Sequence, residues 1–362
     1  MRGESLSGPP PRRIGIRDVA QRAGVAISTV SKVFSGKGEV MPALRMRVLT
    51  AAAELGYQPN SIAQSLRRGA TDLIGFVASD LSDPFSAEIV AGAEFILRPA
   101  GYALLVMSSN HEPETDAANV RYLNSRRVDA MLVSPSREDD RGLLAALAEF
   151  DGPIVAIESE FRSHFPVDSV CADHRQGMRQ AVDHLVRLGH RRIAALTGPL
   201  ARRSGRERLA GFLESLRSHH CEQRGLPIST DHDAGAAEAE VLRLLDSAAP
   251  PTALLAGGLA LLTGTLRALH KRELAPGRDL ALIGWDDGPL AELSVPPIAV
   301  VDRDPRGLGA AAAALALKRL GHRGTGDGEP AHVEVHPARF IARASCGSGI
   351  DHDIQFGGLA HG

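Results

Sequence analysis

The stretch DVAQRAGVAISTVSKVFSG, residues 18–36, places small and apolar residues on both sides of one central glycine, Gly24. The apolar positions recur at helical spacing: Ile16, Val19, Ala20 and Ala23 before the glycine, and Val30, Val33 and Phe34 after it. Two short helices that cross closely at a tight turn form the helix-turn-helix arrangement, whose second helix enters the DNA major groove. The stretch therefore predicts a small DNA-binding head.

A third helix completes this expected head. Pro42 stands near its start and Gly56 just past its end, as is common at helix boundaries. Its apolar face is expected to comprise Leu44, Val48, Leu49, Ala52 and Leu55. On the second helix, the inward apolar set leaves the outward face to Ile27, Ser28, Ser31 and Lys32. Such short side chains suit a helix that enters a groove about 12 Å wide.

Charge is distributed unevenly along the 362 residues. Residues 12–68 carry ten basic and three acidic side chains, a net charge of +7, whereas residues 69–362 carry −9 and the whole chain −2. A basic head on an acidic body indicates that the head meets a polyanion. A solvated basic helix face would carry the same charge, so charge alone leaves that alternative open.

The remaining composition is typical of a globular protein, with 44 % hydrophobic and 23 % charged residues. The longest apolar run, residues 253–266, is shorter than the roughly 20 residues that a membrane span needs, and no apolar secretory segment follows the first arginines. Cys171, Cys221 and Cys346 match no disulfide or zinc spacing. We therefore expect a cytoplasmic protein without a membrane, metal or cofactor partner.

From residue 72 onward, apolar runs alternate with amphipathic stretches. The runs that predict buried strands are LIGFVAS, YALLVMS, DAMLVS, PIVAI, RRIAALT, TALLA and DLALIGW. The stretches that predict helices are 85–98, 113–126, 174–188, 203–219, 234–247 and 259–273. Repeated strand–helix units imply parallel sheets covered by helices on both faces.

Eight blocks stand in order along the chain: IRDVAQRAGVAISTVSKVFSGKGEV, RVLTAAAELGYQPNSIAQSLRRGAT, IGFVASDLSDPFSAEI, RRVDAMLVSP, HLVRLGHRRIAALTGPL, RLAGF, LALIGWDD and VEVHPARFIARAS. Together they resemble the LacI/GalR family of bacterial transcriptional regulators. The resemblance implies a small all-α helix-turn-helix head and an α/β, two-lobed, periplasmic-binding-protein-like body with parallel sheets. It also implies a homodimeric repressor that binds a near-palindromic double-stranded DNA operator and is controlled by a small-molecule effector between the lobes.

The resemblance divides the chain into five parts: a disordered tail (1–11), the DNA-binding head (12–58), a hinge helix or linker (59–71), the effector-binding and dimerisation body (72–345) and a second disordered tail (346–362). Within the body, the chain is expected to cross between the lobes near 158–172, 296–304 and 325–332. The second tail lacks a leucine heptad repeat, so no additional tetramerising coil is expected.

Five positions of the second helix match DNA-contacting positions of the family. Ile27, Ser28 and Lys32 match residues that read base edges; Lys32 could donate to guanine O6 or N7, and Ile27 could meet a thymine methyl. Thr29 and Ser31 match neighbours that fix the helix against phosphate. For these two, ordinary helix-surface polarity is the alternative.

The hinge adds Asn60, Ala63 and Leu66 to the expected DNA contacts. Leu66 matches the residue that wedges between base pairs in the minor groove, with packing on the body as the alternative. One position departs from the family, because Ala26 stands where a serine usually caps the recognition helix. A missing cap costs about 0.5–2 kcal/mol, so we expect a less stable head than in relatives.

Ten residues are expected at the effector. Nine match effector-contacting or cleft-lining positions of the family: Asp80, Phe85, Ser86, Glu158, Asp173, Arg202, Ser204, Arg208 and Asp286; the tenth, Trp285, is a candidate for stacking. Arg208 matches a cleft arginine that grips polar effectors, and Asp286 matches the acid that accepts ligand hydroxyls or amines. Arginine opposite a carboxylate suits a polar, hydroxylated or partly anionic molecule. Surface or interlobe salt bridges remain the alternative for the arginines.

Two departures bear on the class of effector. Leu259 stands where the family usually has an acid that contacts the effector. Ser86 and Ser159 replace the rings of the purine-responsive branch, which leaves Phe85 and Trp285 for stacking. The sequence therefore favours a sugar or sugar-like effector over a purine.

Three other functions were weighed. The motif GLGAAA (307–312) resembles a dinucleotide-binding motif but lacks the acidic residue about 20 positions later that binds ribose. Two clusters, 219–222 and 231–233, contain possible metal ligands, but consecutive side chains diverge and cannot easily gather one ion. A cytoplasmic small-molecule-binding protein without DNA regulation remains the alternative, and the basic head argues against it.

Overall fold

The computed structural model describes residues 14–35, 39–57, 70–221, 225–228, 233–321 and 330–347. The chain forms two compact units, a head and a body, which divide between Thr71 and Asp72. The predicted hinge contacts Asn60, Ala63 and Leu66 lie outside the described residues.

Three helices build the head: α1 (Ile16–Ala23), α2 (Ile27–Ser35) and α3 (Pro42–Glu54). Their crossing is centred on the fully buried side chains of Val19, Val30 and Val48. Gly24 ends α1 in the left-handed conformation, with φ of 62°, which a residue with a Cβ rarely adopts.

The predicted inward face of α3 is wrong at one position. Leu49 is 43 % exposed, whereas Ala51 is buried against the other two helices. A helix of 3.6 residues per turn places positions 48, 51, 52 and 55 on one face, which leaves position 49 at its margin.

The first lobe of the body holds a six-stranded sheet in the order β11-β5-β4-β3-β1-β2, with every neighbouring pair parallel. Its strands are β1 (Leu73–Ala78), β2 (Ala103–Ser108), β3 (Ala130–Ser134), β4 (Ile154–Ile157), β5 (Asp168–Ala172) and β11 (Val333–His336). Its helices are α5 (Pro84–Leu97), α6 (Pro113–Ser125), α7 (Arg141–Ala148) and α13 (Pro305–Gly321). One face of the sheet packs on α5 and α13 and the other on α6 and α7.

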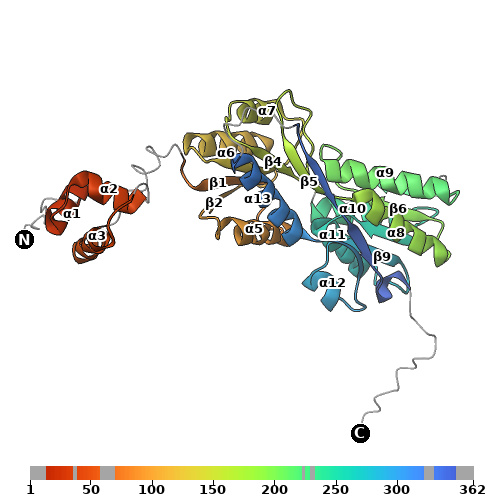
Figure 1. Ribbon diagram of the computed structural model, residues 1–362. Helices are drawn as coiled ribbons and strands as arrows, with labels where there is room; N and C mark the ends of the chain where they lie inside the picture. Colours follow the sequence, from red (N-terminus) through yellow and green to blue (C-terminus); the bar gives the residue numbers. More distant parts are fainter. Residues whose placement is uncertain are drawn as a thin grey trace, which may run out of the picture. The chain divides into compact units, whose positions relative to one another are not determined.

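The second lobe repeats this plan in the order β12-β10-β9-β8-β6-β7, with β12 antiparallel at one edge. Its strands are β6 (Ile193–Leu196), β7 (Gly225–Ile228), β8 (Ala253–Ala256), β9 (Ala281–Trp285), β10 (Ala299–Arg303) and β12 (Ala338–Ile341). Its helices are α8 (His174–Arg187), α9 (Arg203–Ser218), α10 (Ala234–Leu245), α11 (Leu259–Lys271) and α12 (Pro289–Leu293). Helices α8 and α9 cover one face of this sheet and α10 and α11 the other, so each lobe has three layers (Figure 1).

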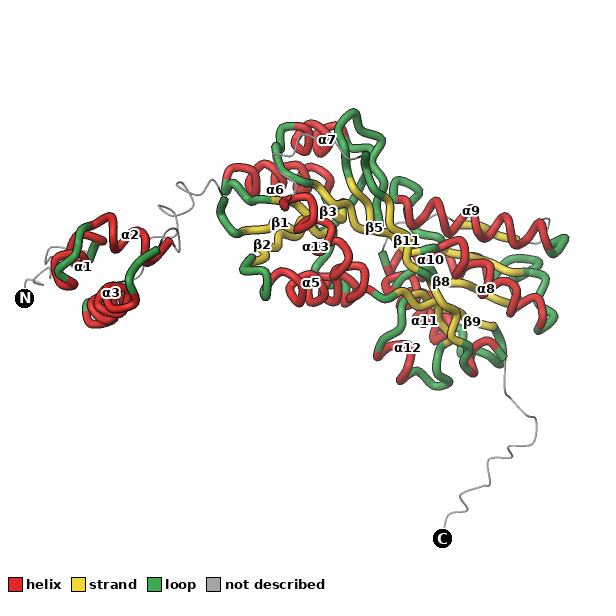
Figure 2. The backbone as a smooth tube through the Cα atoms, in the orientation of Figure 1, coloured by secondary structure: helices red, strands yellow, loops and turns green. Residues whose placement is uncertain are grey.

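The chain passes between the lobes at three places. It leaves β5 for α8 at Asp173, leaves β10 for α13 at Asp304, and leaves β11 for β12 at Pro337. The expected crossing at 325–332 is therefore wrong, because 333–336 still pairs with β5 in the first sheet. Figure 2 shows the long segment around β11 running from one lobe into the other.

Packing in the structure explains two further segments, the residues around Cys346 and the GLGAAA motif. Cys346, which was assigned to a disordered tail, is fully buried in a 3-10 helix (Ala344–Cys346) against the second lobe. The GLGAAA motif lies inside α13, where a Cβ on Gly309 would come within 2.0 Å of the Ile89 carbonyl oxygen on α5. Gly309 therefore serves close packing of α13 on α5. Among the described residues, no helix is long and apolar enough to cross a membrane.

Candidate effector cleft and DNA-binding helix

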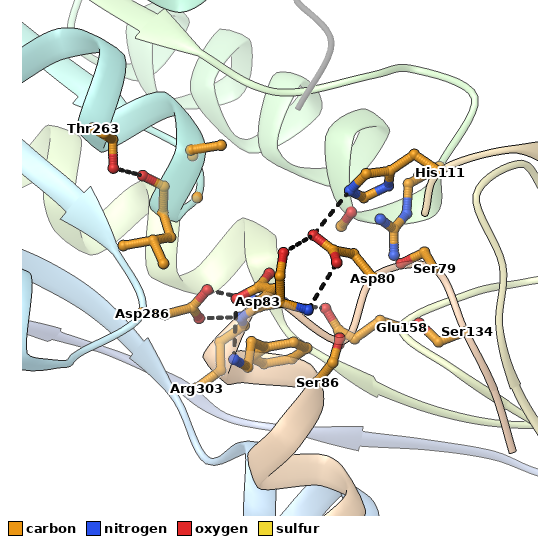
Figure 3. A pocket seen from close by; sticks show the side chains of 18 of the residues that line it. Ser79, Asp80, Asp83, Ser86, His111, Ser134, Glu158, Thr263, Asp286 and Arg303 are labelled. Atoms are coloured by element: carbon orange, nitrogen blue, oxygen red, sulfur yellow. Dashed lines mark hydrogen bonds and ion pairs between the residues drawn. The ribbon is translucent and has the colours of Figure 1, made fainter. Parts of the chain in front are cut away.

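A polar cavity of about 220 Å³ lies between the two lobes, at the carboxyl ends of their strands. Parallel sheets bring those ends to one edge, where the loops that follow them form a crevice. The first lobe contributes Ser79, Asp80, Ser82, Asp83, Phe85, Ser86, His111, Ser134 and Glu158. The second contributes Arg202, Ser204, Arg208, Ala234, Gly257, Gly258, Leu259, Ala260, Thr263, Asp286 and Arg303. Figure 3 shows carboxylates from both lobes turned toward Arg303.

Arg303, at the end of β10, joins the two lobes through buried ion pairs. Its Nε and Nη2 donate to the two carboxylate oxygens of Asp286, each at 2.6 Å, and its Nη1 donates to Glu158 Oε2 at 2.5 Å. Its guanidinium carbon lies 3.8 Å from the ring centroid of Phe85. Against the effect of burial, the charges of Asp286 and Glu158 raise the pKa of Arg303, so this cation is permanent.

Glu158 is 2 % exposed and has a positive φ of 57° directly after β4. It accepts hydrogen bonds from the Ala172 amide at 2.5 Å and, at 2.6 Å, from His174 Nε2. Burial lowers the pKa of His174 to about 4, so at neutral pH this imidazole is a neutral donor. Burial opposes ionisation of Glu158, but its interactions with His174 and Arg303 hold its pKa well below the ordinary value.

Two more acids line the first lobe. Asp83 caps α5, accepting from the Phe85 amide at 3.0 Å, and burial raises its pKa. Asp80 accepts from the Ser82 amide and hydroxyl, both at 2.8 Å, and its Oδ2 lies 3.6 Å from His111 Nε2. Both carboxylates are thus held by their own loop, which fixes their positions at the cavity wall.

Arg208 projects from α9 and is 2 % exposed. Its Nη1 donates to the carbonyl oxygens of Thr197 at 3.2 Å and Gly257 at 2.7 Å, and its guanidinium lies 4.8 Å from the Trp285 ring centroid. Its Nε is buried without a hydrogen-bond partner in the described part of the chain. Arg202, just before α9, also has a buried Nε without such a partner.

The structure brings eight of the ten predicted effector residues to the cavity: Asp80, Phe85, Ser86, Glu158, Arg202, Ser204, Arg208 and Asp286. Asp173 does not line it, because its carboxylate caps α8 by accepting from the Gln176 amide at 2.8 Å. Trp285 does not line it either; it is 1 % exposed and lies beneath Arg208. The predicted stacking role for this ring is therefore wrong.

The cavity lining also includes residues with ionisable or hydroxyl side chains that were not among the predicted ten, among them Asp83, His111, Thr263 and Arg303. Asp83 carries a helix-start signal, since it directly precedes Pro84, and that signal does not indicate a cleft. Arg303 is the last residue of an apolar strand. This position could have identified it as a cleft residue, because polar residues at the carboxyl ends of parallel strands face ligand sites.

The recognition helix α2 presents the expected face. Ile27 is 46 % exposed, and Ser28 and Lys32 are also exposed, whereas Thr29 and Ser31 are half-buried. The amides of Thr29 and Val30 donate to the Ala26 carbonyl oxygen, and Ala26 has no side-chain group to cap the remaining donors. The lower stability expected for the head stays a prediction.

No group of three or more His, Cys, Asp or Glu side chains suited to a metal ion occurs within the described residues. His219 instead pairs with Asp183 at 2.6 Å, and the Cys221 thiol donates to the His219 carbonyl oxygen. Residues 222, 231 and 232 of the two weighed clusters lie outside the described ranges.

Residues 15–60 match the family described as bacterial regulatory proteins, lacI family, and residues 182–346 match a periplasmic binding protein-like domain. The transcriptional regulator DegA of Bacillus subtilis is 31 % identical over 82 % of this chain and 88 % of its own length. The repressor PurR of Klebsiella pneumoniae is 31 % identical over 92 % of this chain and 97 % of its own.

The chain belongs to the LacI family. Among solved structures, a lac repressor dimer bound to operator and the anti-inducer ONPF is similar, with a TM-score of 0.81, 28 % identity, and coverage of 92 % of this chain and 99 % of that one. The regulator CelR in complex with cellobiose has a TM-score of 0.68 and 30 % identity, covering 92 % and 100 %. This LacI-family protein is a DNA-binding transcriptional regulator that responds to a small molecule, and it is not an enzyme.

Proposed function

We propose that this LacI-family regulator is a homodimeric repressor that reads a near-palindromic operator through α2 and the hinge. Each head reads one half-site, with Ile27, Ser28 and Lys32 at base edges and Thr29 and Ser31 against phosphate. The observation that carries the proposal is the exposed polar and basic face of α2 above a fully apolar head core. The hinge contacts of Asn60, Ala63 and Leu66 and a cytoplasmic location belong to the same proposal.

A second copy of the chain is the proposed partner at an exposed apolar surface of the body. Phe95 on α5 is 77 % exposed, and Leu293 and Val295, at and after the end of α12, are 79 % and 94 % exposed. Helices α5 and α12 lie along the same lower edge of the two lobes in Figures 1 and 2. Exposed large apolar side chains can mark a protein contact, and the similar lac repressor structure is a dimer.

The proposed effector is a hydroxylated, sugar-like molecule rather than a purine. Hydroxyls line the cavity at Ser79, Ser86, Ser134 and Ser204, among others. Phe85, whose ring lines the cavity together with the imidazole of His111, already has Arg303 over one face at 3.8 Å. That face of the ring is therefore not open to a planar base, whereas ligand hydroxyls can share donors and acceptors with the guanidinium.

Selection of genomic fragments by the purified full-length protein tests the DNA-binding proposal. The protein should retain a small set of near-palindromic fragments, with affinity that falls steeply with salt because neutralised phosphates release counterions. Lys32→Ala should weaken binding to the selected operator by about 1–3 kcal/mol through lost base contact, and binding to unrelated DNA much less.

Lys271→Ala is the matched control, since this lysine sits on the body and pairs with Glu238; its operator affinity should equal that of the unmodified protein. Failure to enrich any fragment at low ionic strength would contradict the proposal. An equal loss by Lys32→Ala on operator and unrelated DNA would remove the base-reading role of this residue.

A further inference from the structure

We propose that the effector of this regulator carries an anionic group, a carboxylate or a phosphate, that is held by Arg202 and Arg208 on the second lobe. The inference rests on the proposed effector function of the cleft and specifies the chemical class of its ligand. It follows from comparing which charged groups of the cavity wall already have hydrogen-bond partners and which do not.

The acids at the centre of the cleft are occupied. Both oxygens of Asp286 accept from Arg303, each at 2.6 Å. Glu158 accepts from the Ala172 amide, from His174 and from Arg303, at 2.5–2.6 Å. A ligand hydroxyl that approached either carboxylate would compete with a charged guanidinium, whose hydrogen bonds to carboxylates are the strong ones.

The acids of the first lobe each already accept at least one hydrogen bond from their own loop. Asp80 accepts from the amide and the hydroxyl of Ser82 at 2.8 Å. Asp83 accepts from the Phe85 amide at 3.0 Å as the cap of α5. These short local bonds leave the carboxylates available for secondary contacts with ligand hydroxyls, and leave neither of them without a donor.

The two arginines of the second lobe differ from the acids. Arg208 uses only Nη1, on the carbonyl oxygens of Thr197 and Gly257, and its buried Nε has no partner among the described residues. Arg202 likewise has a buried Nε without a partner in the described ranges. Buried donors without acceptors are costly, and both side chains line the cavity. A ligand that supplies acceptor oxygens at this wall would satisfy them.

Two buried carboxylates interact electrostatically with Arg202 without forming a hydrogen bond to it. Glu138 is 4 % exposed, and its two oxygens accept from the Arg203 amide at 2.5 Å and from Arg206 at 2.6 Å. Asp116 is fully buried and lies outside the cavity lining; its Oδ2 accepts from the Ser136 amide at 2.7 Å, its Oδ1 has no partner in the described part of the chain, and burial raises its pKa. Neither acid forms a hydrogen bond with Arg202.

Electrostatics point the same way. Burial lowers the pKa of Arg208 to about 9; the like charges of Arg303 and, more weakly, Arg202 add to that effect, whereas Asp286 and Glu158 oppose it. Burial also lowers the pKa of Arg202. The cationic forms of these two side chains are therefore held at a cost, which an anion between them would relieve. Leu259 lines the same wall with an apolar side chain, so no carboxylate competes for the arginines at that position.

Matched sugar sets distinguish the ligand classes on the full-length protein. Each set contains a neutral sugar, its uronate or aldonate, and its phosphate ester, in the glucose, galactose and ribose series, with inorganic phosphate as the minimal probe. Affinity is measured by thermal shift and titration calorimetry at constant ionic strength. We expect an anionic member to bind at least tenfold more tightly than its neutral parent; the uronate and phosphate arms show which anion the site takes.

Arg202→Gln and Arg208→Gln should each reduce affinity for the anionic ligand at least tenfold and bring it close to that of the neutral parent. Arg217→Gln, an exposed position on the same helix α9, is the matched control and should leave both affinities unchanged. Because Arg208 is buried, circular dichroism and operator binding without ligand verify that each variant is folded.

The inference is overturned if a neutral sugar binds as tightly as its anionic relatives, or if no anionic probe, inorganic phosphate included, stabilises the protein. It is also overturned if Arg202→Gln keeps the full preference for the anion. Operator binding without ligand is measured separately. If the protein binds an operator but its effector is neutral, only this inference is rejected. If the protein binds no operator at all, the proposed function is rejected.

Discussion

The two lobes of the body share one topology and differ in chemistry at the edge where they meet. The strand orders β2-β1-β3-β4-β5-β11 and β7-β6-β8-β9-β10-β12 are equivalent position by position, apart from the antiparallel β12. Yet the first lobe brings Asp80, Asp83 and Glu158 to the cleft, whereas the second brings Arg202, Arg208 and Arg303, besides the paired Asp286. The two lobes therefore show that the sheets set where the cleft lies, whereas the individual side chains that line this edge, from strand ends, helices and loops, set what it can bind.

The largest loss of stability is expected from removing Arg303, the cation that joins the two lobes across the cleft. Arg303→Met leaves Glu158 and Asp286 buried without their partner, and breaking a buried pair in this way costs about 3–5 kcal/mol. Chemical unfolding of the full-length protein, followed by Trp285 fluorescence, measures the loss. Arg306→Met is the control, because the pair of Arg306 with Glu88 lies on the surface and should contribute no more than about 1 kcal/mol. Equal losses of stability in the two variants would show that the buried interlobe pair contributes no more than a surface pair.

A smaller effect, which depends on pH, is expected for the carboxylate of the same pair. The pKa of Glu158 is held below its ordinary 4.5 in the folded protein. The stability that this group contributes is therefore present above pH 4.5 and is lost as the pH falls toward the folded-state pKa. Glu158→Gln should be clearly less stable than the unmodified protein at pH 7, and the difference should narrow at pH 4. A constant difference between the two pH values would contradict this sign.

The smallest of these effects is expected at the rim, where the first lobe caps a helix of the second. Glu138 accepts from the Arg203 amide at the start of α9 and from Arg206, so Glu138→Ala should cost about 1–3 kcal/mol and weaken ligand binding by loosening the lobe contact. Asp139→Ala is the control, since Asp139 is 67 % exposed and pairs with Arg137 of its own loop. Identical ligand affinities for the two variants would remove Glu138 from the lobe contact.

Sequence periodicity located the body helices closely: the expected 85–98 and 203–219 are Pro84–Leu97 and Arg203–Ser218. Such boundaries are local, because caps and apolar spacing determine them. The cleft was harder to predict where a residue's role depends on a distant partner. Arg303 acts only because β10 ends beside Glu158 of the other lobe, and Trp285 is covered by an arginine from α9. Asp173, which is predicted from the sequence to contact the effector, instead caps α8 by accepting from the Gln176 amide.

The tight crossing of α5 and α13 has a mechanical consequence. A Cβ on Gly92 would lie 2.1 Å from the Arg306 carbonyl oxygen, and one on Gly309 would lie 2.0 Å from that of Ile89, so the two helices interlock backbone to backbone and resist sliding. Arg303 is separated from α13 by a single residue, Asp304. A displacement of that guanidinium would therefore move α13 and α5 together as one rigid unit. The movement would reach the outer side of α5, where Phe95 faces solvent, without being absorbed by a flexible loop.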